Sequence, residues 1–135
     1  MTFNAKQDIE VFFGRWARGF DDMCAAYRTA LGDRGEWIAG PPPIPTTHGG
    51  EEAVGLLEDF QNGYDLNAIE VDLLALGESD GVVYSERIDH LVDSQGKRFL
   101  SLPVAGVMRL DGDGRIGYWR DYWDARDFFE LPRRT

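Results

Sequence analysis

Three charged residues, Arg87, Asp89 and Asp121, have the types and spacing that acid–base chemistry requires. Arg87 and Asp89 are two residues apart in an apolar-rich run, so on a β-strand their side chains point to the same face. Asp121 shares the face of a second such run with Trp119 and Trp123. Charged groups among large apolar side chains are costly to bury unless they are paired or do chemistry. An Asp–Arg–Asp cluster in an apolar cavity is therefore a candidate acid–base site.

An ordinary ion pair on a solvated strand face is the alternative for Arg87 and Asp89, because such pairs are common. Two features favour a buried cluster: Leu91 continues the face of Asp89, and tryptophans flank Asp121. The neighbouring run also offers an apolar side, formed by Leu100, Leu102, Val104 and Met108. Apolar surroundings are where the pKa of a carboxyl group is shifted and catalysis is favoured.

The elements that must position these residues fall into two groups, and the first group is helical. Apolar residues recur at three- and four-residue steps over 5–23, which predicts an amphipathic helix. Asp21 can cap a shorter second helix that runs through Leu31 and is stopped by residues 32–35. A short strand is expected at residues 37–38, and a third helix is expected to start near Gly50.

After the third helix the apolar period changes to two, which is typical of strands. Hairpin-turn residues separate the four runs, which cover 66–76, 82–91, 99–110 and 116–124. Helices followed by a meander of long strands indicate an α+β fold in a single domain, 1–135. We expect the N-terminal helices to pack on one face of a strongly curved, mostly antiparallel sheet that encloses an apolar pocket.

Composition excludes several classes of function. The formal charge is −10, from 14 Lys and Arg against 24 Asp and Glu, which disfavours nucleic acid and anionic membranes as partners. No run has the length of a membrane span or the core of a signal peptide, and the single cysteine, Cys24, cannot form an internal disulfide. We therefore expect a cytoplasmic protein.

Other motifs give weaker signals. Residues 111–114 carry two aspartates and two glycines, but an EF-hand loop would need Gly at position 116 and an acid at position 122, so a hairpin turn is the better interpretation. His48 and His90 lack partners at metal-ligand spacing, so no metal site is expected. No phosphate loop, dinucleotide fingerprint or Gly-x-Ser-x-Gly motif is present.

Two segments, 84–89 (Tyr-Ser-Glu-Arg-Ile-Asp) and 117–124 (Gly-Tyr-Trp-Arg-Asp-Tyr-Trp-Asp), together resemble the limonene-1,2-epoxide hydrolase family. That family belongs to a larger group of cone-shaped α+β folds, which includes SnoaL-like polyketide cyclases, ketosteroid isomerase and nuclear-transport-factor-2-like proteins. The resemblance implies that Asp89 is a general acid toward an epoxide oxygen, that Asp121 activates water, and that Arg87 bridges them. It implies no cofactor and a small hydrophobic substrate. The substrate-binding residues would be Trp37, Leu91, Leu102, Val104 and Trp119.

The family holds its water with a Tyr and an Asn two residues apart, and Trp37 and Ala39 stand at the matching place here. The nearby polar residues are Thr46, Thr47 and His48. Two alternatives therefore stay open: a SnoaL-like cyclase or ketosteroid-isomerase-like enzyme, and a non-catalytic lipophile-binding module. An aromatic outer sheet face, formed by Phe99, Tyr118 and Tyr122, and the resemblance together favour a homodimer.

Overall fold

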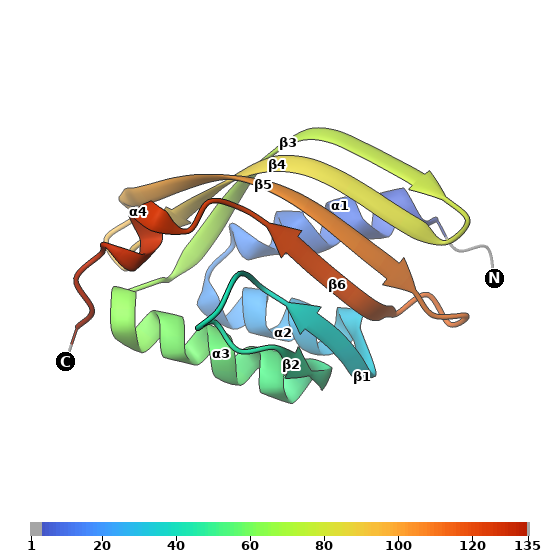
Figure 1. The fold of residues 1–135 in the computed structure, drawn as a ribbon, viewed down its shortest axis with the longest axis horizontal. Coiled ribbons are helices and arrows are strands. Elements are labelled where there is room, and N and C mark those ends of the chain that lie inside the picture. The colour runs from blue at the N-terminus through green and yellow to red at the C-terminus, as the bar shows by residue number, and fades with distance from the viewer. Residues whose placement is uncertain (1–3, 135) are drawn as a thin grey trace.

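The computed structural model describes residues 4–134 and has the expected α+β architecture, in which helices pack on one face of a curved sheet (Figure 1). The helices are α1 (Ala5–Trp16), α2 (Phe20–Ala30), α3 (Gly49–Tyr64) and α4 (Arg126–Phe129). The strands are β1 (Leu31–Ile38), β2 (Thr47–His48), β3 (Ala68–Ser79), β4 (Val82–Val92), β5 (Arg98–Leu110) and β6 (Ile116–Tyr122). Strands β3 to β6 arch over α1, α2 and α3 (Figure 1), and the buried side chains of the core come from both layers.

The sheet has six strands in the order β2-β1-β6-β5-β4-β3. The predicted meander is confirmed, because β3, β4, β5 and β6 pair antiparallel in succession. Strand β1 pairs parallel with β6, and the two-residue strand β2 pairs antiparallel with β1. The N-terminal half of the chain therefore supplies one side of the sheet next to the strand that carries Asp121.

The helix boundaries differ from those predicted. Helix α1 ends at Trp16, and α2 starts directly after Gly19, which has a φ of +132° that an L side chain rarely adopts. The residue at the N-cap of α2 is thus Gly19 rather than Asp21.

The prediction that residues 32–35 only stop a helix was also wrong, because they belong to β1. A Cβ at Gly32 would lie 2.8 Å from Asp111 Oδ2, and one at Gly35 would collide with the Ile116 carbonyl oxygen. These glycines let β1 approach β6 closely, and a sequence pattern does not distinguish that role from a helix stop.

Aromatic side chains fill the space between α1, α2 and the sheet. Phe12, Trp16, Tyr27, Trp37 and Trp119 are all buried, and neighbouring ring centroids lie 4.9–5.9 Å apart. Tilted and edge-on pairs at such distances add to the stabilisation from burial alone. The same cluster forms one wall of the candidate site described below.

The C-terminal segment packs against α3. Phe128 of α4 is buried, and its ring lies 4.8–5.6 Å from those of Phe60, Tyr64 and Trp123. Arg133 Nη2 donates to Asp59 Oδ1 of α3 at 2.7 Å. The segment therefore closes one end of the space between sheet and helices.

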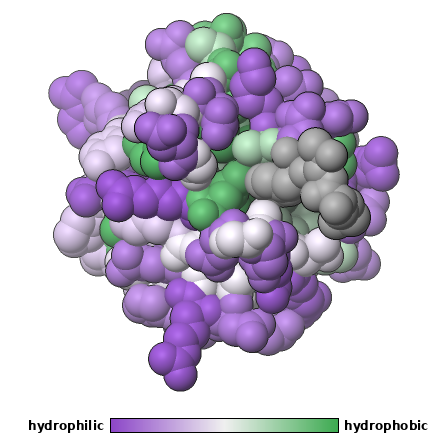
Figure 2. Space-filling model, turned by 90° about the vertical axis from the view of Figure 1, so that its right-hand side faces the viewer, coloured by the Kyte–Doolittle hydropathy of each residue, from purple (hydrophilic) through white to green (hydrophobic). Residues whose placement is uncertain are grey.

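The surface is largely polar. Figure 2 shows the end of the molecule that lies at the right of Figure 1, where hydrophilic side chains cover most of the surface and apolar surface appears chiefly in a recess. Within residues 4–134, no helix is both long and apolar enough to cross a membrane.

Candidate active site

Arg87 joins the two aspartates, as the strand pattern predicted. Its Nε donates to Asp89 Oδ1 at 2.8 Å, and its Nη2 donates to Asp121 Oδ2 at 2.8 Å and to Asp89 Oδ2 at 3.3 Å. A third nitrogen, Nη1, donates to Ser85 Oγ at 3.3 Å. The side chain of Arg87 is fully buried, so these bonds replace the water that a guanidinium would otherwise hold.

Strand β5 makes room for this cluster, because it lies between β4 and β6 and carries a glycine at the critical position. Gly106 pairs with Ser85 on one side and with Asp121 on the other. A Cβ on Gly106 would lie 2.7 Å from Asp121 Oδ1 and 2.8 Å from Arg87 Nη1, both too close for real atoms. The absence of a side chain here is therefore a condition for the Arg87–Asp121 bond.

Helix α1 covers the other side of the guanidinium. The Cζ atom of Arg87 lies 4.9 Å from the ring centroid of Phe13 and 5.7 Å from that of Trp16. Aromatic faces attract a desolvated cation, so the two rings help compensate the burial of Arg87. The amphipathic spacing of α1 thus places Phe13 and Trp16 on its buried face, where they cover the charged cluster.

Asp121 is fixed by two donors, one on each carboxylate oxygen. Trp119 Nε1 donates to Oδ1 at 2.8 Å, and Arg87 occupies Oδ2. Trp119 is completely buried, so its indole has no other orientation available. Each oxygen of a carboxylate has a further lone pair, and those of Asp121 are left for a ligand or water.

Burial and neighbouring charges shift the pKa values of Asp89 and Arg87. Burial raises the pKa of Asp89 to about 6; Arg87 opposes this shift, and the nearby negative charge of Asp121 adds to it. Burial alone would lower the pKa of Arg87, but the negative charges of Asp121 and Asp89 and their hydrogen bonds raise it above its ordinary value. The site therefore pairs a permanent cation with a carboxyl group that is protonated below about pH 6.

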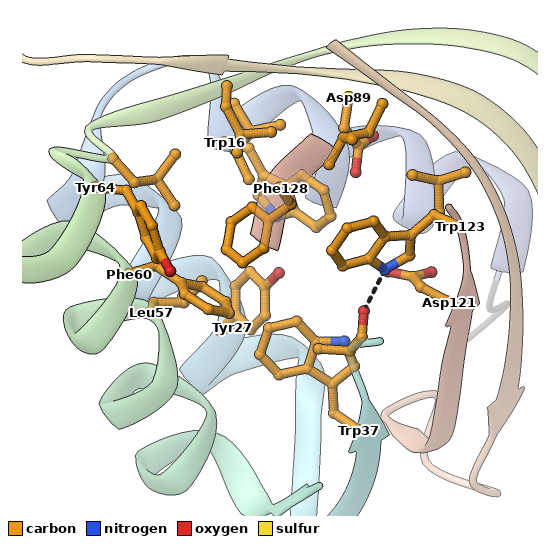
Figure 3. Close-up of a pocket in the computed structure, with 16 residues that line it drawn as sticks. Trp16, Tyr27, Trp37, Leu57, Phe60, Tyr64, Asp89, Asp121, Trp123 and Phe128 are labelled. Atoms are coloured by element: carbon orange, nitrogen blue, oxygen red, sulfur yellow. Dashed lines mark hydrogen bonds between the residues drawn. The ribbon is translucent and has the colours of Figure 1, made fainter. Parts of the chain in front are cut away.

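The carboxyl groups of Asp89 and Asp121 open onto an apolar cavity of about 80 Å³ (Figure 3). The structure places four of the five residues expected to bind substrate in its lining: Trp37, Leu91, Leu102 and Val104. The fifth, Trp119, lies behind the wall and positions Asp121 instead. Ala39 lines the cavity beside Trp37, so both positions expected to hold water do face the site.

Several lining residues were missed at the level of sequence. They come from α1, α2, α3, the start of β3 and the C-terminal segment, and include Trp16, Tyr27, Leu57, Phe60, Tyr64, Ile69, Trp123 and Phe128. Each has the apolar spacing of an ordinary core residue, so no sequence signal separates lining from packing. The predicted polar neighbours Thr47 and His48 form β2 at the sheet edge and are not among the residues that line this cavity.

His90 lies on the opposite face of β4 from Asp89. Its Nε2 is 2.8 Å from Asp72 Oδ2 and its Nδ1 is 2.7 Å from Ser101 Oγ. Asp72, His90 and Ser101 thus have the residue types of a Ser-His-Asp nucleophilic triad. Such a triad also needs free N–H donors that stabilise an oxyanion. His90 and Ser101 face each other in the ladder between β4 and β5, where backbone groups are paired. The three side chains therefore fix one another on the outer face of the sheet.

With the geometry established, comparison with known proteins identifies the family. Residues 5–134 match the model of the limonene-1,2-epoxide hydrolase catalytic domain, so the chain belongs to that family. It is 35% identical over 82 residues to epoxide hydrolase EphG of Mycobacterium tuberculosis. That match covers 61% of this chain and about half (51%) of the relative.

Solved structures agree in fold. A Mycobacterium tuberculosis LEH-like epoxide hydrolase has a TM-score of 0.70 and 28% identity, covering 93% of this chain and 86% of that one. An NTF2-like protein of Burkholderia pseudomallei has a TM-score of 0.77 at 16% identity, covering 97% of this chain and 98% of that one, and shows likeness in fold alone. The predicted cone-shaped fold and family are thereby confirmed.

Proposed function

We propose that this protein is an epoxide hydrolase that adds water to a small hydrophobic epoxide in one step, with Asp121 as general base and Asp89 as general acid. One observation carries the proposal: Arg87 Nη2 donates to oxygens of both carboxylates. The two groups are thus neighbours across a single nitrogen atom at the wall of one cavity. Family membership and the similarity to EphG support the same reaction.

The proton balance of the reaction fits two carboxyl groups in opposite states. The ionised Asp121 takes a proton from water while the water oxygen bonds to an epoxide carbon. The carbon–oxygen bond of the ring breaks, and the carboxyl group of Asp89 gives its proton to the departing oxygen. The product is a diol, and one proton then moves from Asp121 to Asp89 through exchange with water to restore both groups.

Arg87 makes the division of roles workable. Its planar guanidinium stays charged and binds both carboxylates, which holds them in fixed orientation during the reaction. Burial of Asp89 raises its pKa to about 6, so the acid carries a proton in mildly acidic solution. The apolar lining around both groups favours a hydrophobic substrate and excludes bulk water.

Hydrolysis in ¹⁸O-labelled water, with a panel of small hydrophobic epoxides, tests the proposal. The expected product is a diol that contains one solvent oxygen. Asp89→Asn and Asp121→Asn should each lower kcat by roughly a hundredfold or more, because removing a general acid or base typically costs that much. Wild-type turnover in the Asp121→Asn variant would contradict the assignment of the base.

A SnoaL-like cyclase or isomerase is the second candidate, favoured by one observation. Trp37 and Ala39 line the cavity where the family's water-holding pair is expected, and neither side chain offers an acceptor for a water proton. A product that carries deuterium from D₂O at carbon, and no solvent oxygen, would favour that reaction over hydrolysis.

A further inference from the structure

Tyr27 is a buried pocket residue to which the reaction above gives no role. It belongs to α2, is only 2% exposed, and lines the cavity together with Asp89 and Asp121. Its ring is held among indoles, with centroids 4.9 Å from Trp37 and 5.4 Å from Trp119. Figure 3 shows its hydroxyl directed into the pocket rather than toward the helices. The ring therefore has one orientation, and that orientation presents an oxygen to the site.

The charges of Asp121, Arg87 and Asp89 affect the pKa of this hydroxyl. Burial raises the pKa of Tyr27 well above its ordinary value, and the negative charge of Asp121 is the next largest cause; Arg87 opposes the shift and Asp89 adds to it. The group is therefore a neutral phenol at neutral pH. Within residues 4–134 the pKa of this hydroxyl is not affected by a side-chain hydrogen bond, and its oxygen can accept from a ligand.

A water molecule that attacks carbon must be held in a defined orientation. One of its O–H bonds points to the base, Asp121, and a lone pair points to the carbon. The second O–H bond needs an acceptor that is not itself required for the acid step. That requirement removes Asp89 from consideration.

Other neutral side chains around the cavity do not meet this need. Indole N–H groups donate and cannot accept, and those of Trp16 and Trp37 are buried without a partner among the described residues. The Ala39 carbonyl oxygen accepts from Trp123 Nε1 at 2.7 Å and keeps one further lone pair. Tyr64 stands on the side of the pocket away from Asp121 (Figure 3). Tyr27 is therefore the neutral side chain that can accept on the Asp121 side of the pocket.

We propose that Tyr27 is a positioning residue for the nucleophilic water, whose second O–H bond its phenol oxygen accepts while the first is given to Asp121. The inference rests on the proposed epoxide hydrolysis and names the group that does the work expected at positions 37 and 39. A residue of α2 thereby takes over the task expected of positions 37 and 39. The consequence is a water held from the α2 side of the cavity.

Tyr27→Phe removes only the hydroxyl and keeps the ring in its aromatic cluster. We expect kcat for a hydrophobic epoxide to fall ten- to a hundredfold, the scale of loss from a misplaced reacting atom, with KM changed less than about threefold. Tyr84→Phe, a half-exposed tyrosine on the outer face of β4, is the matched control and should keep wild-type kinetics. Thermal unfolding of both variants should match that of the wild type.

Rescue separates positioning from mere packing. Adding Trp37→Tyr and Ala39→Asn to the Tyr27→Phe variant places an acceptor pair at the end of β1 and should raise kcat at least tenfold above that of Tyr27→Phe. A purely structural role for Tyr27 would lower thermal stability and would not respond to this change. Wild-type kcat in Tyr27→Phe, with the wild type producing labelled diol, would overturn the inference while leaving the hydrolase proposal intact. A wild type that forms no diol from any epoxide would overturn both.

Discussion

The alkaline limb of the pH–rate profile, where Asp89 loses its proton, is the property that the structure sets most directly. Asp89 can act as a general acid only while it is protonated, and burial places its pKa at about 6 instead of 3.8. With a pKa near 6, roughly nine-tenths of the molecules carry the proton at pH 5 and about a tenth at pH 7. We therefore expect kcat/KM to fall about tenfold from pH 5 to pH 7, then tenfold per further pH unit.

The same shift predicts how stability depends on pH. The folded pKa lies above the unfolded one, so the stabilising contribution of Asp89 is fully present below about pH 4 and is lost as pH rises through 6. A shift of about two units corresponds to about 3 kcal/mol. Because part of this is already lost at pH 4, the wild type should lose roughly 2 kcal/mol in free energy of unfolding, relative to Asp89→Asn, between pH 4 and pH 7.

Steady-state rates and urea unfolding across pH 4 to 8, for the wild type, Asp89→Asn and Glu86→Gln, measure both effects. Glu86 is exposed on the opposite face of the same strand, so its variant should keep the wild-type profile. A rate that stays constant from pH 5 to pH 7, or a descending limb that survives in Asp89→Asn with unchanged midpoint, would refute the reasoning.

Three further predictions concern the surroundings of the site. Gly106→Ala should lower kcat at least tenfold, because its Cβ would meet Asp121 and Arg87, whereas Gly77→Ala, at a strand glycine with open space around it, should keep wild-type rates. Arg87→Lys should lower kcat by more than tenfold and reduce the melting temperature, since an ammonium cannot reproduce the planar contacts to both carboxylates; an unchanged rate would show that bridging is dispensable. The exposed aromatic residues on the outer sheet face, Tyr84 and Tyr122 among them, predict a homodimer, and a monomer mass in light scattering at micromolar concentration would count against it.

Much of the site could be predicted because it depends on the two-residue period of strands. Arg87 and Asp89 had to share a face with Leu91, and the turn before Ile116 had to return the chain antiparallel, which brought Asp121 to the same side. These are local rules, and long strands with clear turns obey them.

What could not be predicted depends on contacts between distant segments. The parallel pairing of β1 with β6 joins residues far apart in the sequence, and only that pairing explains why glycines 32 and 35 stand in a strand. Tyr27 and Phe128 carry the apolar spacing of core residues, yet both line the cavity. Periodicity predicts which face of an element is buried, but not whether a neighbouring atom or an empty space lies beside it.

A single-turnover experiment tests the central claim, direct attack of water on the epoxide between Asp121 and Asp89, most directly. Enzyme in excess over a hydrophobic epoxide is mixed in ¹⁸O-labelled water, and the diol of the first turnover is analysed by mass spectrometry. Direct attack predicts one ¹⁸O atom in every diol molecule of that turnover and no label in the protein. An unlabelled first-turnover diol, with ¹⁸O appearing in the carboxyl group of Asp121 or Asp89, would show that a carboxylate attacks the epoxide itself and would contradict the account.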